Sequence, residues 1–318
     1  MNYIMVVAGL MMLIIGGELL IRSAMSAANK LQVSPFLSGL VIVGFGTSMP
    51  ELIVSVNALI NDNPAIALGN VIGSNIGNIG LIIGTCGLIA PLAFKQSALK
   101  RDAIVMFSAV LLLMLMAITG HFSIVAGLIM LSALFAYLGF TIYKENHQNS
   151  ASKKLHQDEG KTLHSKPHKT WLVVISLLLG LALLMLGAQW FVTSATIIAT
   201  ELGVSEALIG LTLVAIGTSL PEFTISVMAV LRKNIDVAIG NIIGSNIFNI
   251  LGILGVSALI SPIPFSGRFA VYDQWALLII TLVLTLFLVF GHAIGKIKSM
   301  LLLVFYIVYI ALGYIYFN

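Results

Sequence analysis

The chain alternates between long apolar runs and short polar breaks that contain glycine, proline or charged residues. An α-helix needs about 20 apolar residues to cross a bilayer, and most of these runs reach that length. The pattern predicts an all-α membrane protein with ten membrane-spanning helices. They are expected, to within about four residues, near 3–28, 35–60, 65–92, 102–119, 122–143, 170–199, 206–231, 236–260, 272–291 and 299–317.

One long polar segment, residues 144–169, interrupts the pattern at its centre. It holds six lysines, three acidic residues and four histidines, and it lacks apolar periodicity. We therefore expect a first five-helix repeat at 1–143, a linker at 144–169 and a second five-helix repeat at 170–318. The irregular spacing of the four histidines favours a solvated loop over a metal-binding tract.

Composition supports the membrane assignment. Hydrophobic residues make up 59% of the 318 residues and charged residues only 9%, whereas soluble domains carry about 25% charged residues. A soluble globular protein is thereby excluded. The single cysteine, Cys86, cannot form a disulfide within the chain, and its apolar surroundings predict a buried, unreactive thiol.

The basic residues predict the orientation of the helices, because Lys and Arg are retained on the cytoplasmic side of a membrane. With ten helices and an outside N-terminus, 15 of the 16 basic residues fall in cytoplasmic segments and only Arg268 falls outside. We therefore expect both termini outside and the 144–169 loop in the cytoplasm.

The sequence contains an internal repeat. Residues 39–84 match residues 210–255 without a gap, with 24 identities in 46 positions at an offset of 171. This offset spans five predicted crossings, an odd number, so equivalent helices run in opposite directions. Inverted repeats of this kind are typical of secondary transporters, whose substrate sites lie near the bilayer midplane where the repeats meet.

Each copy of the repeat carries one glutamate inside an apolar helix: Glu51 ends GFGTSMPE and Glu222 ends AIGTSLPE. A carboxylate there costs about 3 kcal/mol unless it has a partner. Neither glutamate has a basic residue in the adjacent helical turns, so a bound cation is the expected partner. The preceding proline interrupts the helix and exposes backbone oxygen. By contrast, Glu18 and Arg22 lie four residues apart and are expected to form a structural pair.

Other oxygen-bearing side chains recur around the glutamates. Thr and Ser precede each glutamate by four and three residues, and the motif on the next helix, GNVIGSNIGNI or GNIIGSNIFNI, places Ser and Asn four residues apart. The candidate cation ligands are Glu51, Thr47, Ser48, Ser74, Asn78, Glu222, Thr218, Ser219, Ser245 and Asn249. Asn70, Asn75, Asn241 and Asn246 add nearby amides, and Gly69, Gly73, Gly240 and Gly244 form small-residue faces that allow close helix packing.

This set contains oxygen ligands but no His or Cys, which argues against zinc and copper. Its two carboxylates and several neutral oxygens suit Ca²⁺, which takes six to eight oxygen ligands, and Na⁺ can share the same oxygens.

The duplicated motifs GTSxPE and GNxxGSNxxNI in antiparallel five-helix halves resemble the sodium/calcium exchanger family of the cation/calcium antiporter superfamily. The resemblance covers nearly the whole chain, and the short linker resembles prokaryotic members. It implies Ca²⁺/Na⁺ antiport in the plasma (inner) membrane of a prokaryote. It also implies that the ten candidate ligands, with carbonyls near Gly44 and Ala215, bind the ions while the first and sixth helices slide. Family members often carry Asp where this chain has Asn249, which leaves the coupling ratio and the counter-ion open.

Three alternatives remain at this stage. A proton/calcium antiporter could use the same glutamates, and a potassium-linked exchanger is a weaker variant. A cation channel is disfavoured because channels usually arrange their filters by rotational symmetry. An enzyme is not expected, because the chain lacks the sequence motifs of hydrolases and phosphate-binding loops. No cofactor, nucleic acid or obligate protein partner is expected besides the lipid bilayer.

Overall fold

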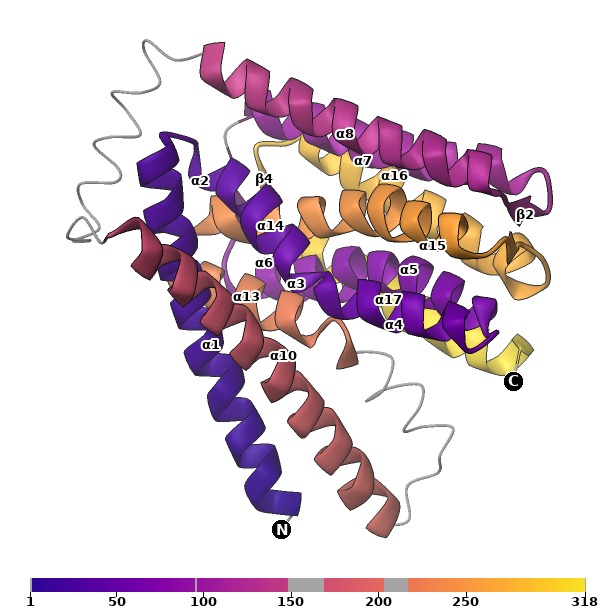
Figure 1. Cartoon of the computed structure of the whole chain (residues 1–318), viewed down its shortest axis with the longest axis horizontal. Coiled ribbons are helices and arrows are strands. Elements are labelled where there is room, and N and C mark those ends of the chain that lie inside the picture. Colours follow the sequence, from indigo (N-terminus) through magenta and orange to yellow (C-terminus); the bar gives the residue numbers. More distant parts are fainter. Residues whose placement is uncertain (1, 95, 148–168, 203–216, 318) are drawn as a thin grey trace.

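The computed structural model describes residues 2–94, 96–147, 169–202 and 217–317. The described residues form helices joined by short loops, with two small strand pairs (Figure 1). In the first half the elements are α1 (Asn2–Leu31), α2 (Pro35–Leu37), η1 (Ser38–Val43), α3 (Gly44–Thr47), α4 (Met49–Ile60), α5 (Pro64–Gly77), η2 (Asn78–Ile83), α6 (Gly84–Ile89), β1 (Leu92–Ala93), α7 (Gln96–Ala117), β2 (His121–Phe122) and α8 (Ile124–His147).

The second half follows a similar order. Its described elements are α10 (Thr170–Glu201), α13 (Leu220–Leu231), α14 (Ile235–Ile247), η4 (Phe248–Ile253), α15 (Leu254–Ile260), β3 (Ile263–Pro264), η5 (Phe269–Asp273), α16 (Gln274–Phe290), β4 (Ala293–Ile294) and α17 (Lys296–Phe317). The η elements are π-helical segments, which occur mostly as short insertions in α-helices and often at functional sites.

Eight helices among the described residues are long and apolar enough to cross a membrane. They are Asn2–Leu31, Pro35–Ile60, Pro64–Ile89, Ile124–Lys144, Thr170–Glu201, Ile235–Ile260, Phe269–Phe290 and Lys296–Phe317. Each coincides with a predicted helix, and its ends lie within about four residues of the predicted ones. The chain is therefore a multi-pass helical membrane protein.

The predicted fourth helix, 102–119, begins earlier than expected. Its counterpart α7 starts at Gln96, so Lys100 and Arg101 lie within the helix rather than before it. Arg101 makes two contacts with the carboxylate of Asp102, at 2.6 and 2.8 Å, and this pairing compensates the charges inside the helix. The prediction placed the boundary at the charges because it treated them as loop residues.

Two predicted segments are covered only in part. Residues 206–216 of the predicted seventh helix lie outside the described residues, and its remainder contains α13, which starts at Leu220. Most of the predicted linker, 148–168, also lies outside them, while α8 extends to His147.

Helices α1 and α10 pack side by side in opposite directions and cross the remaining helices at a steep angle (Figure 1). Glycines allow this contact. A Cβ added to Gly16 would lie 2.9 Å from the carbonyl oxygen of Gly180, and one added to Gly9 would lie 2.8 Å from that of Gly187. The two helices therefore form a closely packed pair.

The interior is centred on the spans Pro64–Ile89 and Ile235–Ile260, which are the most buried of the eight. Gly240 and Gly244 pack against the backbone around Leu40, as expected for small-residue faces. The positions equivalent to this backbone in the second half, near residue 211, lie outside the described residues, so the prediction for Gly69 and Gly73 stays untested.

Two short antiparallel strand pairs join loops that are distant in the sequence. Leu92 in β1 pairs with Ile294 in β4, and Phe122 in β2 pairs with Ile263 in β3. Each pair ties a loop of the first half to a loop of the second. Cys86 is buried, as predicted.

Candidate cation site

The helix that carries Glu51 is interrupted directly before it. Helix α3 ends at Thr47, Ser48 has φ −84° and ψ 6°, and α4 begins at Met49 with Pro50 in its first turn. Proline lacks an N–H group and is tolerated best in a first turn. Glu51 therefore lies in the first turn of α4, where the helix dipole favours a carboxylate.

The helix that carries Glu222 begins in the same way. Ser219 has φ −88° and ψ 7°, and α13 begins at Leu220 with Pro221 in its first turn. Glu222 lies in that turn as well. The two copies of the motif thus have matching local structure.

The two glutamates are fully buried and linked to the opposite half of the chain. Ser219 donates a hydrogen bond to Glu51 Oε1 at 3.2 Å, and Ser48 donates one to Glu222 Oε1 at 2.9 Å. Both carboxylates are 0% exposed. The structure therefore brings these four predicted site residues together in one buried region.

Four buried oxygens of the predicted ligand set accept no hydrogen bond from the described residues. They are Oε2 of Glu51, Oε2 of Glu222, Oδ1 of Asn78 and Oδ1 of Asn249. A buried polar group without a partner costs about 1–3 kcal/mol, and a charged one costs more. A cation bound between these oxygens would remove that cost.

Asn78 and Asn249 lie at equivalent points where the helix becomes π-helical. Asn78 is the first residue of η2, and Asn249 is the second residue of η4. The amide of Asn249 donates to Ser74 Oγ at 3.0 Å, so this contact joins a ligand candidate of each half. The amide of Asn78 donates to Asn246 Oδ1 at 3.4 Å.

Ser245 and Gly44 form another contact between the halves. The hydroxyl of Ser245 donates to the carbonyl oxygen of Gly44 at 3.0 Å. A Cβ on Gly44 would lie 2.9 Å from the carbonyl oxygen of Asn241, so a larger residue there would push the two helices apart. Ala215, the other residue expected to offer a carbonyl, lies outside the described residues.

The two threonines donate to asparagines of the opposite half. Thr47 Oγ1 lies 3.1 Å from Asn241 Oδ1, and Thr218 Oγ1 lies 3.4 Å from Asn70 Oδ1. All ten candidate ligands thus lie among the described residues. Each of them makes at least one hydrogen bond to the opposite half of the chain.

Each of these asparagines also donates hydrogen bonds to the glutamate-bearing helix of its own half. Asn70 Nδ2 donates to the carbonyl oxygen of Glu51 and to Ser55 Oγ, both at 2.9 Å. Asn241 Nδ2 donates to the carbonyl oxygen of Glu222 at 3.3 Å and to Ser226 Oγ at 2.9 Å.

Sequence reasoning named the asparagines only as nearby amides and missed both serines. The available signal was that Ser55 and Ser226 are identical at the repeat offset of 171.

Two further buried carboxylates lie outside this region and are already paired. Asp102 contacts Arg101, and Asp273 accepts hydrogen bonds from Arg268 at 3.1 Å and from Tyr309 at 2.8 Å. Among the described residues no group of three or more His, Cys, Asp or Glu side chains could hold a metal ion. The carboxylate, amide and hydroxyl oxygens around Glu51 and Glu222 are of the kind that suits a hard cation better than a soft metal.

Most of the chain also matches a known protein family. A family model described as sodium/calcium exchanger protein matches residues 1–143 and 172–315. The chain belongs to the sodium/calcium exchanger family. Members of this family are transporters, and the expected resemblance is thereby confirmed.

Its relatives cover most of its length or nearly all of it. It is 31% identical over 340 residues to the sodium/calcium exchanger MaX1 of Methanosarcina acetivorans, covering 97% of each chain. It is 32% identical over 261 residues to the inner membrane protein YrbG of Escherichia coli, covering 81% of this chain and 79% of the relative. The solved structure of the sodium-calcium exchanger NCX_Mj superposes with a TM-score of 0.82 at 32% identity, covering 98% and 97% of the two chains.

Proposed function

We propose that this exchanger moves Ca²⁺ across the membrane in return for Na⁺, by alternating access to one site between Glu51 and Glu222. The observation that carries the proposal is the set of four buried oxygens without hydrogen-bond donors among the described residues, two of them from carboxylates. Two carboxylates give the site a formal charge of −2, which one Ca²⁺ or two Na⁺ would neutralise. The names of MaX1 and NCX_Mj as sodium/calcium exchangers support the same choice of ions.

The proposed ligands are the ten residues predicted from the repeat. In the first half they are Thr47, Ser48, Glu51, Ser74 and Asn78, and in the second half Thr218, Ser219, Glu222, Ser245 and Asn249. Hydrogen bonds between the halves at Ser48, Ser219 and Asn249 support the idea that they act as one group. Carboxylate, amide and hydroxyl oxygens are the ligands that Ca²⁺ prefers.

The proposed architecture has ten spans, with repeats at 1–143 and 170–318 in opposite orientation and a cytoplasmic loop at 144–169. Both termini face outward in this arrangement. The strand pairings support it: β1 and β4 belong to loops assigned to the cytoplasmic side, and β2 and β3 belong to loops assigned to the outside. The name of the related inner membrane protein YrbG supports the plasma (inner) membrane of a prokaryote as the location.

Helices α1 and α10 are the proposed moving part. Their backbones touch through glycines, whereas α1 meets the rest of the molecule through side chains such as that of Met228, which faces Gly17. A pair that is packed internally more closely than against its surroundings can shift as a unit. Such a shift would open the site to one side of the membrane and then to the other.

Sodium is the proposed counter-ion because of the hydroxyl ligands. Ser and Thr oxygens can coordinate Na⁺, but they do not take up protons near neutral pH. A proton/calcium antiporter would rely on the two glutamates alone. The family resemblance implies Asp in many members at the position of Asn249, so the number of Na⁺ ions exchanged per Ca²⁺ is a separate question.

The test is uptake of calcium-45 into proteoliposomes that contain the purified protein. One set of vesicles is loaded with Na⁺, a second with K⁺ at the same ionic strength, and a third with K⁺ at acidic internal pH. We expect rapid uptake in the first set only. Uptake driven by the pH gradient without Na⁺ would establish proton/calcium antiport, and equal uptake in all sets would point to a channel.

A further inference from the structure

A pocket with charged, neutral polar and apolar walls lies between α1, the start of α10 and the end of α13, away from the candidate cation site. Its volume is about 750 Å³, and its charged lining residues are Glu18, Arg22 and Arg232. Along α13, Arg232 lies ten residues after Glu222, which corresponds to about 15 Å at 1.5 Å per residue. The pocket is therefore a separate region at the basic end of the molecule.

The three charged side chains form one cluster. Glu18 Oε1 lies 2.6 Å from Arg22 Nε, and Glu18 Oε2 lies 3.0 Å from Arg232 Nη2. The expected Glu18–Arg22 pair is thus confirmed, and it is extended by an arginine of the second half. One carboxylate faces two guanidinium groups, so the cluster has a formal charge of +1. Each guanidinium has five N–H donors and uses only part of them on Glu18.

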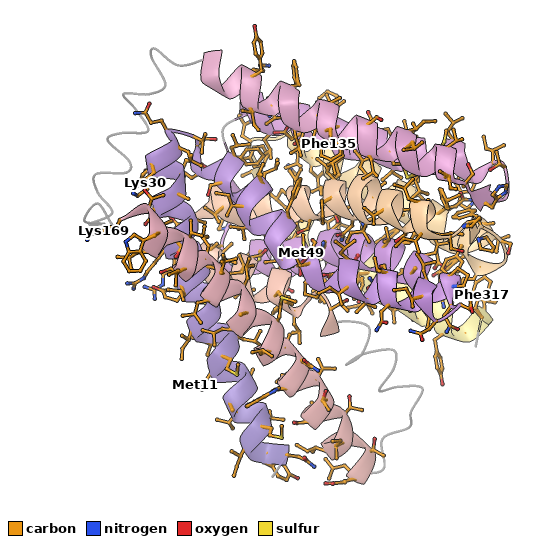
Figure 2. All side chains as sticks on the ribbon, viewed as in Figure 1. Met11, Lys30, Met49, Phe135, Lys169 and Phe317 are labelled. Carbon is orange, nitrogen blue, oxygen red and sulfur yellow. The ribbon has the colours of Figure 1, made fainter. Side chains whose placement is uncertain are left out.

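Neutral polar side chains complete the lining. Asn29, Ser176 and Asn234 line the pocket, and their side chains make no hydrogen bond to any other described residue. Lys30 adds positive charge nearby, because its Nζ donates to Thr170 Oγ1 at 3.0 Å, next to the pocket. Figure 2 shows Lys30 and Lys169 at the same end of the α1–α10 pair. These groups suit an anion with several acceptor oxygens and disfavour a cation.

The position of the pocket also favours a lipid. Its walls include apolar side chains such as Met25 and Leu172, and the adjoining Trp171 is 57% exposed at the start of α10. Tryptophan at a helix end is typical of the interface between membrane and water. A ligand there would meet cationic donors at the level of the headgroups and apolar surface toward the acyl chains.

We propose that this pocket binds the phosphate headgroup of an anionic phospholipid. Arg22 and Arg232 would donate hydrogen bonds to the phosphate oxygens. The side chains of Asn29, Ser176 and Asn234 would form hydrogen bonds with the rest of the headgroup. The proposal is independent of which ions the protein exchanges.

The test is native mass spectrometry of the full chain in detergent, titrated with phosphatidylglycerol and with phosphatidylcholine of the same acyl chains. Both lipids offer the same phosphate, but the choline cation is repelled by the cluster of formal charge +1, and like charges brought together cost several kcal/mol. We therefore expect phosphatidylglycerol to bind at least about tenfold more tightly. Arg22→Gln and Arg232→Gln should each remove this preference. Lys233→Gln is the matched control, because it removes the same charge one residue away from Arg232 and does not line the pocket.

Either of two results with the variants would overturn the proposal. One is equal binding of phosphatidylglycerol by the arginine variants and the wild type, and the other is an equal loss in Lys233→Gln, which would indicate unspecific attraction to the basic surface. Glycerol phosphate is added as a soluble competitor. If it displaces the lipid at equal concentration, the pocket recognises a free phosphate ester and not a lipid. Identical elution of all variants in size-exclusion chromatography excludes misfolding as the cause.

Discussion

In each glutamate of the candidate site, the two carboxylate oxygens have different surroundings. Oε1 accepts a hydrogen bond from a serine of the opposite half, and Oε2 has no donor among the described residues. The serine fixes the orientation of the carboxylate, while the second oxygen stays available to a ligand. Two such groups, both fully buried, repel each other unless a cation lies between them.

Replacing either glutamate by glutamine should abolish ion exchange. Glu51→Gln and Glu222→Gln each keep the size of the side chain but remove one negative charge from the site. Losing one partner of a buried ionic group costs about 3–5 kcal/mol, and each 1.4 kcal/mol is tenfold, so we expect calcium-45 uptake to fall by at least about a hundredfold. Glu201→Gln, at an exposed position near the end of α10, should transport like the wild type. Robust uptake by either site variant would contradict the assignment.

Asn241 is expected to act as a positioning residue rather than as a ligand. It accepts a hydrogen bond from Thr47 and donates to the carbonyl oxygen of Glu222 and to Ser226. Asn241→Ala should therefore raise the Ca²⁺ concentration for half-maximal uptake by roughly tenfold, since each lost hydrogen bond is worth about 1 kcal/mol. Maximal uptake should change little, because both carboxylates remain.

The control for Asn241 is Asn57→Ala, which removes an exposed asparagine from α4. A change of the same size in both variants would assign the effect to general destabilisation. A complete loss of uptake in Asn241→Ala would instead mean that this side chain binds the ion.

At this scale the sequence predicted the ligand candidates but not their partners. The repeat located Glu51 and Glu222, because an acidic residue inside an apolar run needs a special explanation. It could not predict that Thr47 contacts Asn241 rather than an asparagine of its own half, since that depends on how the two halves pack. The pairing of Arg232 with Glu18 was missed for the same reason.

Among the elements, the pair α1 and α10 depends most directly on small residues. A Cβ on Gly16 would lie 2.9 Å from the carbonyl oxygen of Gly180, too close for an ordinary contact. Gly16→Val should destabilise the protein by about 1–3 kcal/mol through overpacking. We expect a lower midpoint in a thermal unfolding assay in detergent, together with slower exchange.

Gly139→Val in α8 is the matched control, because a Cβ there would meet no described atom within 4 Å. The two variants add the same side chain to a membrane helix. If both lowered the midpoint equally, the cost would come from valine in a helix and not from the contact between α1 and α10.

Helix positions were the most predictable elements, because long apolar runs have few alternatives in a membrane. The beginning of α7 was predicted too late, since charged residues were assumed to end the helix and the pairing of Arg101 with Asp102 could not be foreseen. The π-helical segments and the strand pairs were not predicted either. The strand pairs depend on contacts between distant parts of the chain, such as that of Leu92 with Ile294.

In the whole molecule the two halves correspond even outside the candidate cation site. Asp102 and Asp273 are separated by the repeat offset of 171, both are buried, and each is paired with an arginine close to it in sequence. The proposed topology places these two pairs on opposite sides of the membrane, as an inverted arrangement requires. Their equivalence supports a duplication that extends beyond the matched segment 39–84.

The orientation of the molecule can be tested at the two ends of one helix. Ser266 and His292 are exposed and lie in the loops before and after the span Phe269–Phe290. In intact cells, a maleimide that cannot cross the membrane should label Ser266→Cys and leave His292→Cys unlabelled until the membrane is permeabilised. Native Cys86 is buried and serves as the unlabelled background.

The reverse pattern would invert the proposed topology and place 15 of the 16 basic residues outside, against their normal retention in the cytoplasm. Labelling of both cysteines in intact cells would mean that this segment does not cross the membrane, and would contradict the ten-span arrangement itself.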